Sequence, residues 1–225
     1  MFLPKTISRF FILSISSVAA FTLAGCGSGG GLADSATASR IVPVSNGEVD
    51  VSLSQVNGGS VSSSRVGLVA FATGINQDRG QFVAVAGIAD GATVGEPVTE
   101  GTVTYDTRYN YQISGDISRS SSTISGRTTS RRFDGRTTLT ANFDTGRLTG
   151  STSDLEVDGR INGQTVSGTA VVDFDTSSAF SVTSPLIGSV STDLNGQIGD
   201  TGVIATFDGS DEDTVVAGGL VGTAN

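Results

Sequence analysis

After residue 40, apolar and polar residues alternate with a period of two along most of the chain. Thr137, Leu139, Ala141 and Phe143 place mostly apolar side chains on one face of a strand, and polar residues occupy the positions between them. Such alternation is typical of strands with one buried face. No apolar stripe with the 3.6-residue period of a helix persists for the roughly 10 to 12 residues that a helix needs. The sequence therefore predicts an all-β protein.

The same alternation predicts core positions and strand limits further along the chain. It recurs at Val166, Gly168, Ala170, Val172 and Phe174 and at Val203, Ala205 and Phe207, which we expect in the core. We expect strands at residues 66–74, 81–89, 98–106, 109–118, 134–143, 146–157, 163–174, 186–197, 202–208 and 213–221. Five dipeptides are typical of tight hairpin turns, namely Asp134-Gly135, Asp158-Gly159, Asn162-Gly163, Asn195-Gly196 and Asp208-Gly209.

A sheet of this many strands would leave unpaired edges if it stayed open, and closure into a barrel removes them. We therefore expect a closed antiparallel barrel, with a β-sandwich as the alternative. A transmembrane barrel needs aromatic girdles at both membrane interfaces. The chain has no Trp and three Tyr, which argues against that architecture.

The first 25 residues have a basic start, Lys5 and Arg9, followed by an apolar stretch. This pattern is typical of a secretory targeting segment. The tetrapeptide Leu23-Ala24-Gly25-Cys26 resembles the lipobox of bacterial lipoproteins, which implies cleavage before Cys26 and attachment of lipid to that cysteine. Gly27 in place of Asp favours the outer membrane by resemblance to enterobacterial sorting rules. The alternative is an ordinary secretory signal that happens to adjoin a cysteine.

Composition excludes several classes of function. Without Lys5 and Arg9 the chain has 11 basic residues, all Arg, against 22 acidic ones, a formal charge of −11. Repulsion from phosphate makes such a chain a poor nucleic-acid binder. The chain lacks His, which excludes Ser-His-Asp and Cys-His catalysis and His-ligated metals. We expect a non-enzymatic protein with no cofactor and no metal.

Basic residues are concentrated in one segment of this acidic chain. Five of the 11 arginines lie within 18 residues and form a candidate binding loop: Arg119, Arg127, Arg131, Arg132 and Arg136. The planar guanidinium group suits carboxylate, phosphate or sulfate. The loop could therefore contact an acidic partner, lipopolysaccharide or a polyanionic glycan. The alternative is a solvated loop that balances an acidic barrel.

Two further clusters are weaker candidates. Tyr105, Tyr109 and Tyr111 share strand parity and could form an aromatic contact face, although half-buried barrel packing is the commoner role of such residues. Asp208, Asp211, Glu212 and Asp213 crowd one expected hairpin. They match a calcium loop poorly, so a solvated acidic turn is the favoured interpretation.

Five short motifs occur in an order and spacing that resemble a known family. They are Val85-Ala-Gly-Ile, Gly101-Thr-Val-Thr-Tyr105, Leu139-Thr-Ala-Asn-Phe143, Leu148-Thr-Gly-Ser151 and Val216-Ala-Gly-Gly219. Over residues 80–225 the set resembles the β-barrel domain of transferrin-binding protein B-like lipoproteins. The resemblance implies an eight-stranded barrel on a lipid tether, and family members bind host iron proteins, haem carriers or complement regulators. Leu220-Val221 departs from the aromatic residue that the family usually has near its end.

These observations predict the organisation and role of the chain. We expect a signal peptide at 1–25, a flexible Gly/Ser/Ala tether at 26–40, a small strand-rich annex at 41–95 and an eight-stranded antiparallel up-and-down barrel at 96–225. The predicted function is a monomeric, non-catalytic binding module for a protein or small ligand, in nutrient or iron acquisition or in host interaction. It would be anchored by lipid to the outer membrane, either exposed at the surface or facing the periplasm. The alternative is a structural envelope lipoprotein with no dedicated ligand.

Overall fold

The computed structural model describes residues 33–35, 42–43, 49–50, 53–76, 81–115, 119–120, 123–124, 129–175 and 186–225. All of the regular elements in these ranges are strands, which confirms the all-β prediction. The same ranges contain no helix with the length and hydrophobicity needed to cross a bilayer. The predicted signal peptide and the lipobox, with Cys26, lie outside the described residues.

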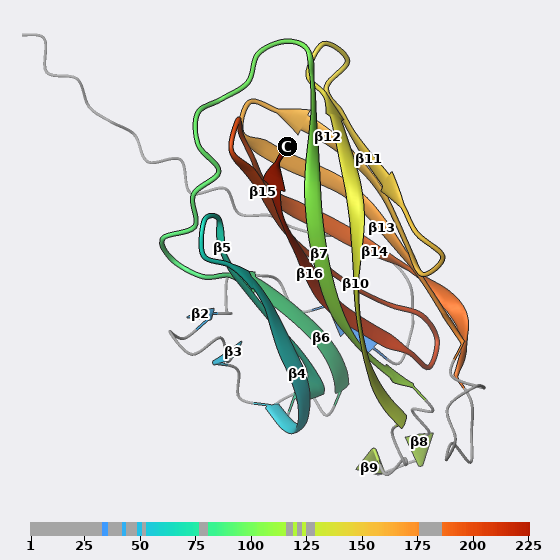
Figure 1. Ribbon diagram of the computed structural model, residues 1–225. Helices are drawn as coiled ribbons and strands as arrows, with labels where there is room; N and C mark the ends of the chain where they lie inside the picture. The colour runs from blue at the N-terminus through green and yellow to red at the C-terminus, as the bar shows by residue number, and fades with distance from the viewer. Residues whose placement is uncertain are drawn as a thin grey trace, which may run out of the picture.

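Eight antiparallel strands form a closed barrel in the order β10-β11-β12-β13-β14-β15-β16-β7 (Figure 1). They are β7 (Thr102–Gly115), β10 (Thr129–Asn142), β11 (Arg147–Ser151), β12 (Leu155–Asn162), β13 (Thr165–Asp175), β14 (Ile187–Ile198), β15 (Gly202–Ser210) and β16 (Val215–Ala224). Two short strands, β8 (Arg119–Ser120) and β9 (Thr123–Ile124), pair with each other between β7 and β10 in the chain. The barrel closes where β16 pairs with β7, from Val215 opposite Ser114 to Ala224 opposite Tyr105. The predicted eight-stranded up-and-down barrel is confirmed, in preference to the sandwich.

The barrel interior is filled by the residues that alternation placed in the core. Side chains of Leu139, Ala141, Val172 and Phe207 are buried there. Apart from Gly168, which has no side chain, the residues of the other two predicted core rows are buried as well: Val166, Ala170, Phe174, Val203 and Ala205. Period-two alternation therefore identified the inward face of β10, β13 and β15 correctly.

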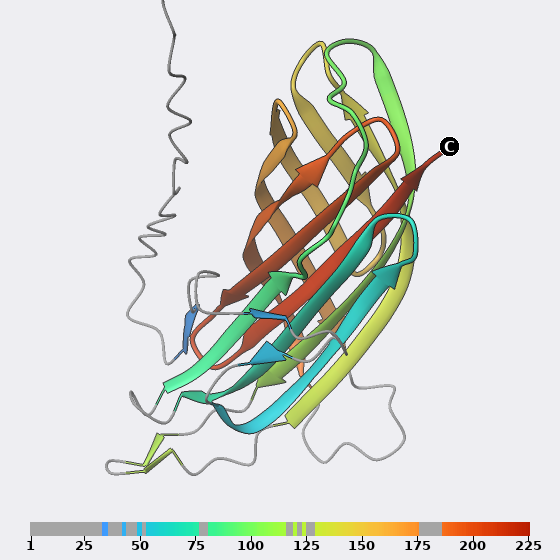
Figure 2. The same ribbon diagram turned by 90° about the vertical axis from the view of Figure 1, so that its left-hand side faces the viewer.

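A second sheet lies against the outside of this barrel (Figures 1 and 2). Its antiparallel strands are β4 (Leu53–Ser63), β5 (Gly67–Asn76) and β6 (Gln81–Ile88), and β1 (Ala33–Ser35), within the predicted tether, pairs in parallel with β6. We call it sheet A. The short strands β2 (Val42–Pro43) and β3 (Val49–Asp50) pair with each other. The described strands of sheet A pair with no barrel strand, so the contact between the two sheets is through side chains.

Sheet A buries the outer faces of β15 and β16. Phe71 and Phe82 pack against Val215 and Ala217 in one apolar cluster. In another cluster Val69 packs against Ile204 and Val221. The Val69 side chain comes very close to the β16 backbone at one glycine, since a Cβ on Gly219 would lie 2.2 Å from Cγ1 of Val69. The last strand is therefore buried on both faces, which explains why its sequence is nearly continuously apolar rather than alternating.

Several strand limits differ from the prediction, and β10 begins at Thr129 rather than at residue 134. The ranges 98–106 and 109–118 are one continuous strand, β7, and the predicted strand at 146–157 is divided into β11 and β12. A turn at Thr152 causes the division. Its hydroxyl oxygen accepts hydrogen bonds from the backbone N–H of Asp154 (3.4 Å) and of Leu155 (3.0 Å), which bends the chain back. The strand β4 was not predicted.

Four of the five hairpin turns predicted from dipeptides are wrong. Only Asn162-Gly163 lies in a tight turn, where Gly163 has a φ of 60°. The other four glycines lie inside β10, β12, β14 and β15. At Gly135 the reason is space, since a Cβ there would lie 2.3 Å from the hydroxyl oxygen of Tyr109 on the neighbouring strand. The missing side chain at this position lets the tyrosine ring cross β10.

We predict that Gly135→Ala lowers the free energy of unfolding by about 2 kcal/mol, because the added methyl group displaces the Tyr109 ring. Urea unfolding followed by circular dichroism measures the effect. The same substitution in a Tyr109→Ala background should cost much less, since the ring is absent. Equal costs in the two backgrounds would show that the ring is not the obstacle.

Candidate functional site

Two arginines lie directly opposite each other on neighbouring strands of the outer barrel wall. Arg136 on β10 is the register partner of Arg108 on β7, and both side chains are exposed. Like charges in directly opposed positions of a sheet destabilise the pairing by about 0.2–1 kcal/mol. The barrel therefore keeps two cations together at a cost, and an anion between them would relieve the repulsion.

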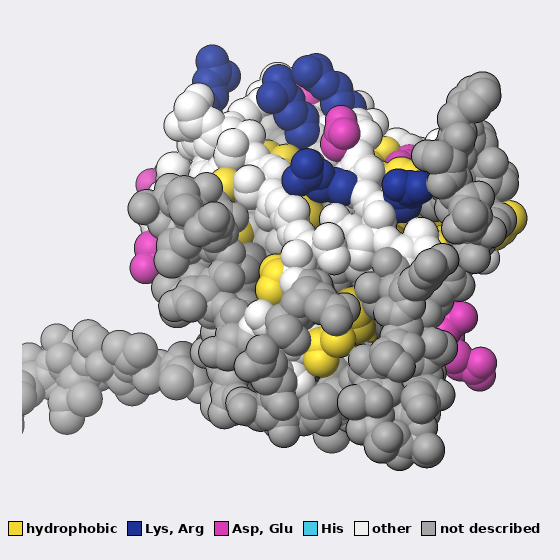
Figure 3. Space-filling model, turned by 90° about the horizontal axis from the view of Figure 1, so that it is seen from below, with side chains coloured by type: hydrophobic (Ala, Val, Ile, Leu, Met, Phe, Trp, Pro, Cys, Tyr) yellow, Lys and Arg dark blue, Asp and Glu magenta, His cyan; other side chains and the backbone are white. Residues whose placement is uncertain are grey.

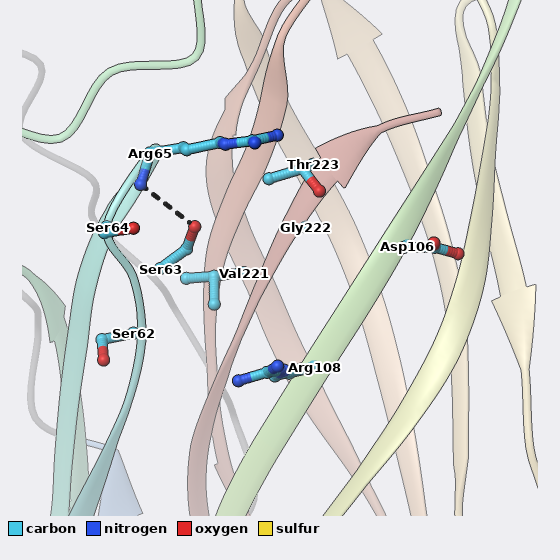
Figure 4. A pocket seen from close by; sticks show the side chains of 9 residues that line it. All are labelled: Ser62, Ser63, Ser64, Arg65, Asp106, Arg108, Val221, Gly222 and Thr223. Carbon is cyan, nitrogen blue, oxygen red and sulfur yellow. Dashed lines mark hydrogen bonds between the residues drawn. The ribbon is translucent and has the colours of Figure 1, made fainter.

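Open hollows flank this arginine pair on both sides. One, of about 270 Å³, lies between the β4–β5 hairpin and the barrel wall and is lined by Arg65, Arg108, Asp106 and Thr223 among others (Figure 4). The other, of about 660 Å³, is lined by Arg108 and Arg136 and shares Asp106 and Thr223 with the first. The larger volume falls within the range of roughly 300–1,000 Å³ typical of small-ligand sites. The two hollows form one continuous depression across the outer face of β7.

Arg132 precedes Asp134 by two residues and Arg136 by four, and all three side chains are exposed on the same face of β10. Nη1 of Arg132 donates a hydrogen bond to the backbone oxygen of Gly58 in β4 (3.2 Å), which ties this side chain to sheet A. We call Arg65, Arg108, Arg132 and Arg136 the arginine face. Within the described part of the chain, none of these four forms an ion pair. Figure 3 shows the dark blue Lys and Arg side chains gathered on one side of the molecule seen from below.

A second arginine pair in the barrel is neutralised, unlike the first. Arg147 on β11 is the register partner of Arg160 on β12. Here Arg147 forms a two-point salt bridge with Asp158, with Nε–Oδ1 and Nη2–Oδ2 distances of 3.2 and 2.9 Å. The hydrogen bonds from Arg147 lower the pKa of the Asp158 carboxyl, and the charges of Arg147 and Arg160 add to that lowering. No described carboxylate forms an ion pair with Arg108 or Arg136, although Asp106 lines the hollows beside them.

The structure brings part of the predicted arginine loop together. Arg132 and Arg136 lie on the arginine face, whereas Arg131 belongs to the inward-facing row of β10, and its Nε is buried with no hydrogen-bond partner among the described residues. Nothing is described of the side chain of Arg119, and Arg127 lies outside the described residues.

The three tyrosines share one face of β7, as their parity predicts, and that face is the barrel interior. Tyr105, Tyr109 and Tyr111 are at most 4% exposed. The Tyr111 ring stacks on Phe133, with centroids 5.2 Å apart, and lies 6.1 Å from the Tyr109 ring. A partner that touches only the outer wall cannot reach them, so the packing interpretation describes these residues better than the contact face.

Asp154, in the β11–β12 turn, organises the hydroxyl groups of this aromatic row. Its Oδ1 accepts from Tyr109 (2.7 Å) and from Thr152 (2.7 Å), and its Oδ2 accepts from Tyr111 (3.2 Å). Burial, and then the nearby Asp154, raise the pKa of Tyr111. Burial raises the pKa of Tyr109 to about 12, and that of Tyr105, near Asp200, also to about 12. These phenols are neutral hydrogen-bond donors at physiological pH.

The acidic hairpin between β15 and β16 uses its carboxylates in the turn itself. Asp211 Oδ1 accepts from the backbone N–H of Glu212 (2.7 Å), and Asp213 Oδ1 accepts from the Thr214 hydroxyl (3.0 Å). In the described ranges no three His, Cys, Asp or Glu side chains are arranged to hold a metal ion. Asp208 lies in β15 rather than in the turn.

Sequence reasoning missed Arg65, Arg108 and Asp154. The sequence could have placed Arg108 on the outer wall, because its position number is even whereas those of the three tyrosines, on the inner face of the same strand, are odd. Its neighbour Arg136 follows only from the β7–β10 register. Arg65 and Asp154 lie in turns whose approach to the barrel depends on tertiary packing, and no local pattern marks them.

We predict that the free energy of unfolding falls as the pH rises from about 10 to about 12. The unfolded chain releases the Tyr109 proton near the ordinary value of 10.0, whereas the folded chain holds it to about 12, so alkaline conditions favour the unfolded state. Below pH 10 this tyrosine is neutral in both states and adds no pH dependence. Urea unfolding at a series of pH values should give a shallower alkaline decline for Tyr109→Phe than for the natural chain. Identical slopes would exclude Tyr109 as a source.

No model of a known protein family matches the chain, and no curated protein does. Among solved structures it is similar to transferrin-binding protein B, isotype 1, of serogroup B Neisseria meningitidis (12% identity, TM-score 0.44), over 82% of this chain and 37% of that one. A mutant of the vaccine antigen transferrin-binding protein B of Haemophilus parasuis Hp5 is similar at 13% identity and a TM-score of 0.45, over 76% and 35% of the two chains. HpuA of Kingella denitrificans, solved with human haemoglobin, is similar at 14% identity and a TM-score of 0.34, over 82% and 72%. The chain thus spans little more than a third of the transferrin-binding chains, and its function has to come from its own residues.

Proposed function

We propose that this chain is a lipid-anchored, non-catalytic binding module whose arginine face receives an anionic ligand. The observation that carries the proposal is the Arg108–Arg136 pair, two opposed cations that form no ion pair with any described residue of a strongly acidic chain. Carboxylate, phosphate and sulfate groups all suit the guanidinium fork. The chemistry of the site therefore favours an acidic protein surface or a polyanionic glycan.

Several features of the site favour ligand binding over a merely solvated surface. The hollows beside the arginine pair give an anionic group room to approach from the side of the β4–β5 hairpin and from the side of β10. Arg65 reaches over the first hollow from that hairpin (Figure 4). Ser62, Ser63 and Thr223 add hydroxyl groups that can donate to the same anion. The site offers charge and hydrogen bonds and contains no group positioned to break or form a bond.

The lipobox resemblance supports the anchor. Lipid on Cys26 would hold the barrel at the envelope, and multiple acyl chains make such attachment lasting. The resemblance to transferrin-binding protein B-like lipoproteins supports an outer-membrane location and a role in host interaction or nutrient acquisition. A surface-exposed module would meet host proteins and glycans directly.

We predict that Arg108→Gln with Arg136→Gln weakens binding of a sulfated glycan such as heparin by about tenfold or more at low ionic strength. The full lipidated protein in nanodiscs serves for the measurement, by surface plasmon resonance over a range of salt. Arg147→Gln with Arg160→Gln is the matched control, since it removes two cations from the pair that Asp158 already neutralises. Equal losses in both double variants would indicate a response to net charge rather than a site. Failure of the natural protein to bind heparin or acidic proteins would favour the structural envelope role.

We also predict that Cys26 carries the anchor. Mass spectrometry of the natural protein should find an amino-terminal Cys26 with the added mass of acyl chains, and the protein should sediment with the outer membrane. Cys26→Ser should remain without lipid because it lacks the thiol that the lipid modifies. A free Cys26 thiol on protein released into the medium would contradict the anchor.

A further inference from the structure

Among the described residues, the lower half of β10 has an edge with no strand beside it. The strands β7 and β10 each have 14 residues and pair along their whole lengths. On its other side β10 pairs with β11 only through Thr140, Ala141 and Asn142. The strand β11 has five residues, and its turn into β12 stops well above the lower end of β10 (Figure 1). Residues 130–137 therefore pair on one side only.

The register identifies the backbone groups at this edge. The backbone N–H of Phe143 donates to Gly101 oxygen and continues the β7–β10 ladder, so the backbone N–H and C=O groups of the odd-numbered β10 residues point toward β7. The backbone groups of the even-numbered residues point away from β7, and the Thr138 oxygen indeed points at Gly150 of β11. The N–H and C=O groups of Ser130, Arg132, Asp134 and Arg136 thus lie along the open edge. At about 3.4 Å per residue this edge is roughly 24 Å long.

Side chains on the two faces of this edge differ in character. On the outside, Arg132, Asp134 and Arg136 are exposed. On the inside, Phe133 and Thr137 are only partly buried, whereas the Tyr111 side chain opposite Phe133 is fully buried. The partly exposed Phe133 ring therefore lies on the inner face next to the edge, and Arg131 belongs to the same inward row.

We propose that this edge accepts an extended segment of a partner protein as an added strand, with acidic side chains on its outward positions and small or β-branched apolar side chains toward the barrel. Unpaired N–H and C=O groups in an extended row are complementary to another strand, which is how sheet edges capture peptides. Carboxylates opposite Arg132 and Arg136 would make cross-strand pairs of opposite charge. Apolar residues on the other face would contact Phe133.

Charge selects against a second copy of this chain as the occupant. Each edge carries one aspartate and three arginines, Arg131 on the inner face and Arg132 and Arg136 on the outer face, so two copies would bring together edges of the same net charge. An acidic segment would instead be attracted to this net positive edge. The proposal does not depend on the anion site, because backbone pairing carries it.

The test uses the full chain and a synthetic peptide of alternating Glu and Val, about seven residues long with blocked ends. We expect fluorescence anisotropy to show binding, and hydrogen exchange to show slower exchange at the edge amides of Arg132, Asp134 and Arg136. A peptide of alternating Lys and Val should bind at least about tenfold more weakly. The Glu–Val peptide with N-methyl groups on the backbone amides of its Glu residues, which face the edge when their side chains point outward, should not bind, because it cannot form the ladder.

Asp134→Pro and Asp134→Ala form a matched pair of variants. Both remove the carboxylate, but only proline removes the edge N–H, and its amide faces away from β7, so the existing ladder stays intact. We expect the Ala variant to bind the Glu–Val peptide more tightly than the natural chain. The Pro variant should bind at least about tenfold more weakly than the Ala variant, with circular dichroism verifying that it folds.

Three outcomes would overturn the proposal: equal peptide binding by the two Asp134 variants, unchanged binding of the N-methylated peptide, or protection that maps away from residues 130–136. Concentration-dependent dimerisation abolished by Asp134→Pro would instead identify a second copy as the occupant. Heparin binding separates this proposal from the anion site, since it should be equal in the Pro and Ala variants. If Arg108→Gln with Arg136→Gln leaves heparin binding unchanged while the natural chain binds the Glu–Val peptide at the edge, only the anion site is rejected.

Discussion

Unequal strand lengths determine much of this barrel. The strand β10, with 14 residues, lies between β7, also with 14, and β11 with five, so its ladder with β11 ends at Thr140. Backbone groups beyond that point need partners of another kind or water. Side chains span part of the gap, because Tyr109 crosses β10 above Gly135 and donates to Asp154 in the β11–β12 turn. The wall is thus closed inside by side chains and open at the backbone edge.

Sheet A determines which outer surface remains available. It covers Ile204 of β15 and the apolar outward residues of β16, and its polar contacts extend to the lower part of β7 through the Thr73–Ser114 hydroxyl pair (2.7 Å). What it leaves exposed is the upper wall of β7 and the outside of β10, where the arginines lie. Elsewhere on the barrel the opposed pair Arg147 and Arg160 has Asp158 beside it. Among the described residues no ion pair forms at Arg108 and Arg136, which distinguishes this pair from Arg147 and Arg160.

Local sequence patterns correctly predicted the features that depend on a single strand, such as which side chains share a face. Alternation placed Leu139 and Val172 in the core, and parity placed the three tyrosines on one face. The hairpin turn predicted at Asp134-Gly135 was wrong, because Gly135 makes room for the neighbouring Tyr109 ring and does not adopt a positive φ. The pairing of Arg108 with Arg136 was beyond reach, since it requires the register between two strands. Likewise Arg131 and Arg132 are adjacent in sequence yet lie on opposite sides of the wall.

The two proposed surfaces meet at Arg136, which belongs both to the opposed arginine pair and to the open edge. They ask for different chemistry, since a polyanion needs only cations and hydroxyls whereas a strand also needs the backbone. An acidic strand at the edge would neutralise Arg136 and so reduce the attraction of the neighbouring hollow for an anion. Linkage makes such an effect reciprocal, so an anion held by Arg108 and Arg136 would weaken strand addition by the same factor. One arginine would thus make the two kinds of ligand compete without any change in the fold.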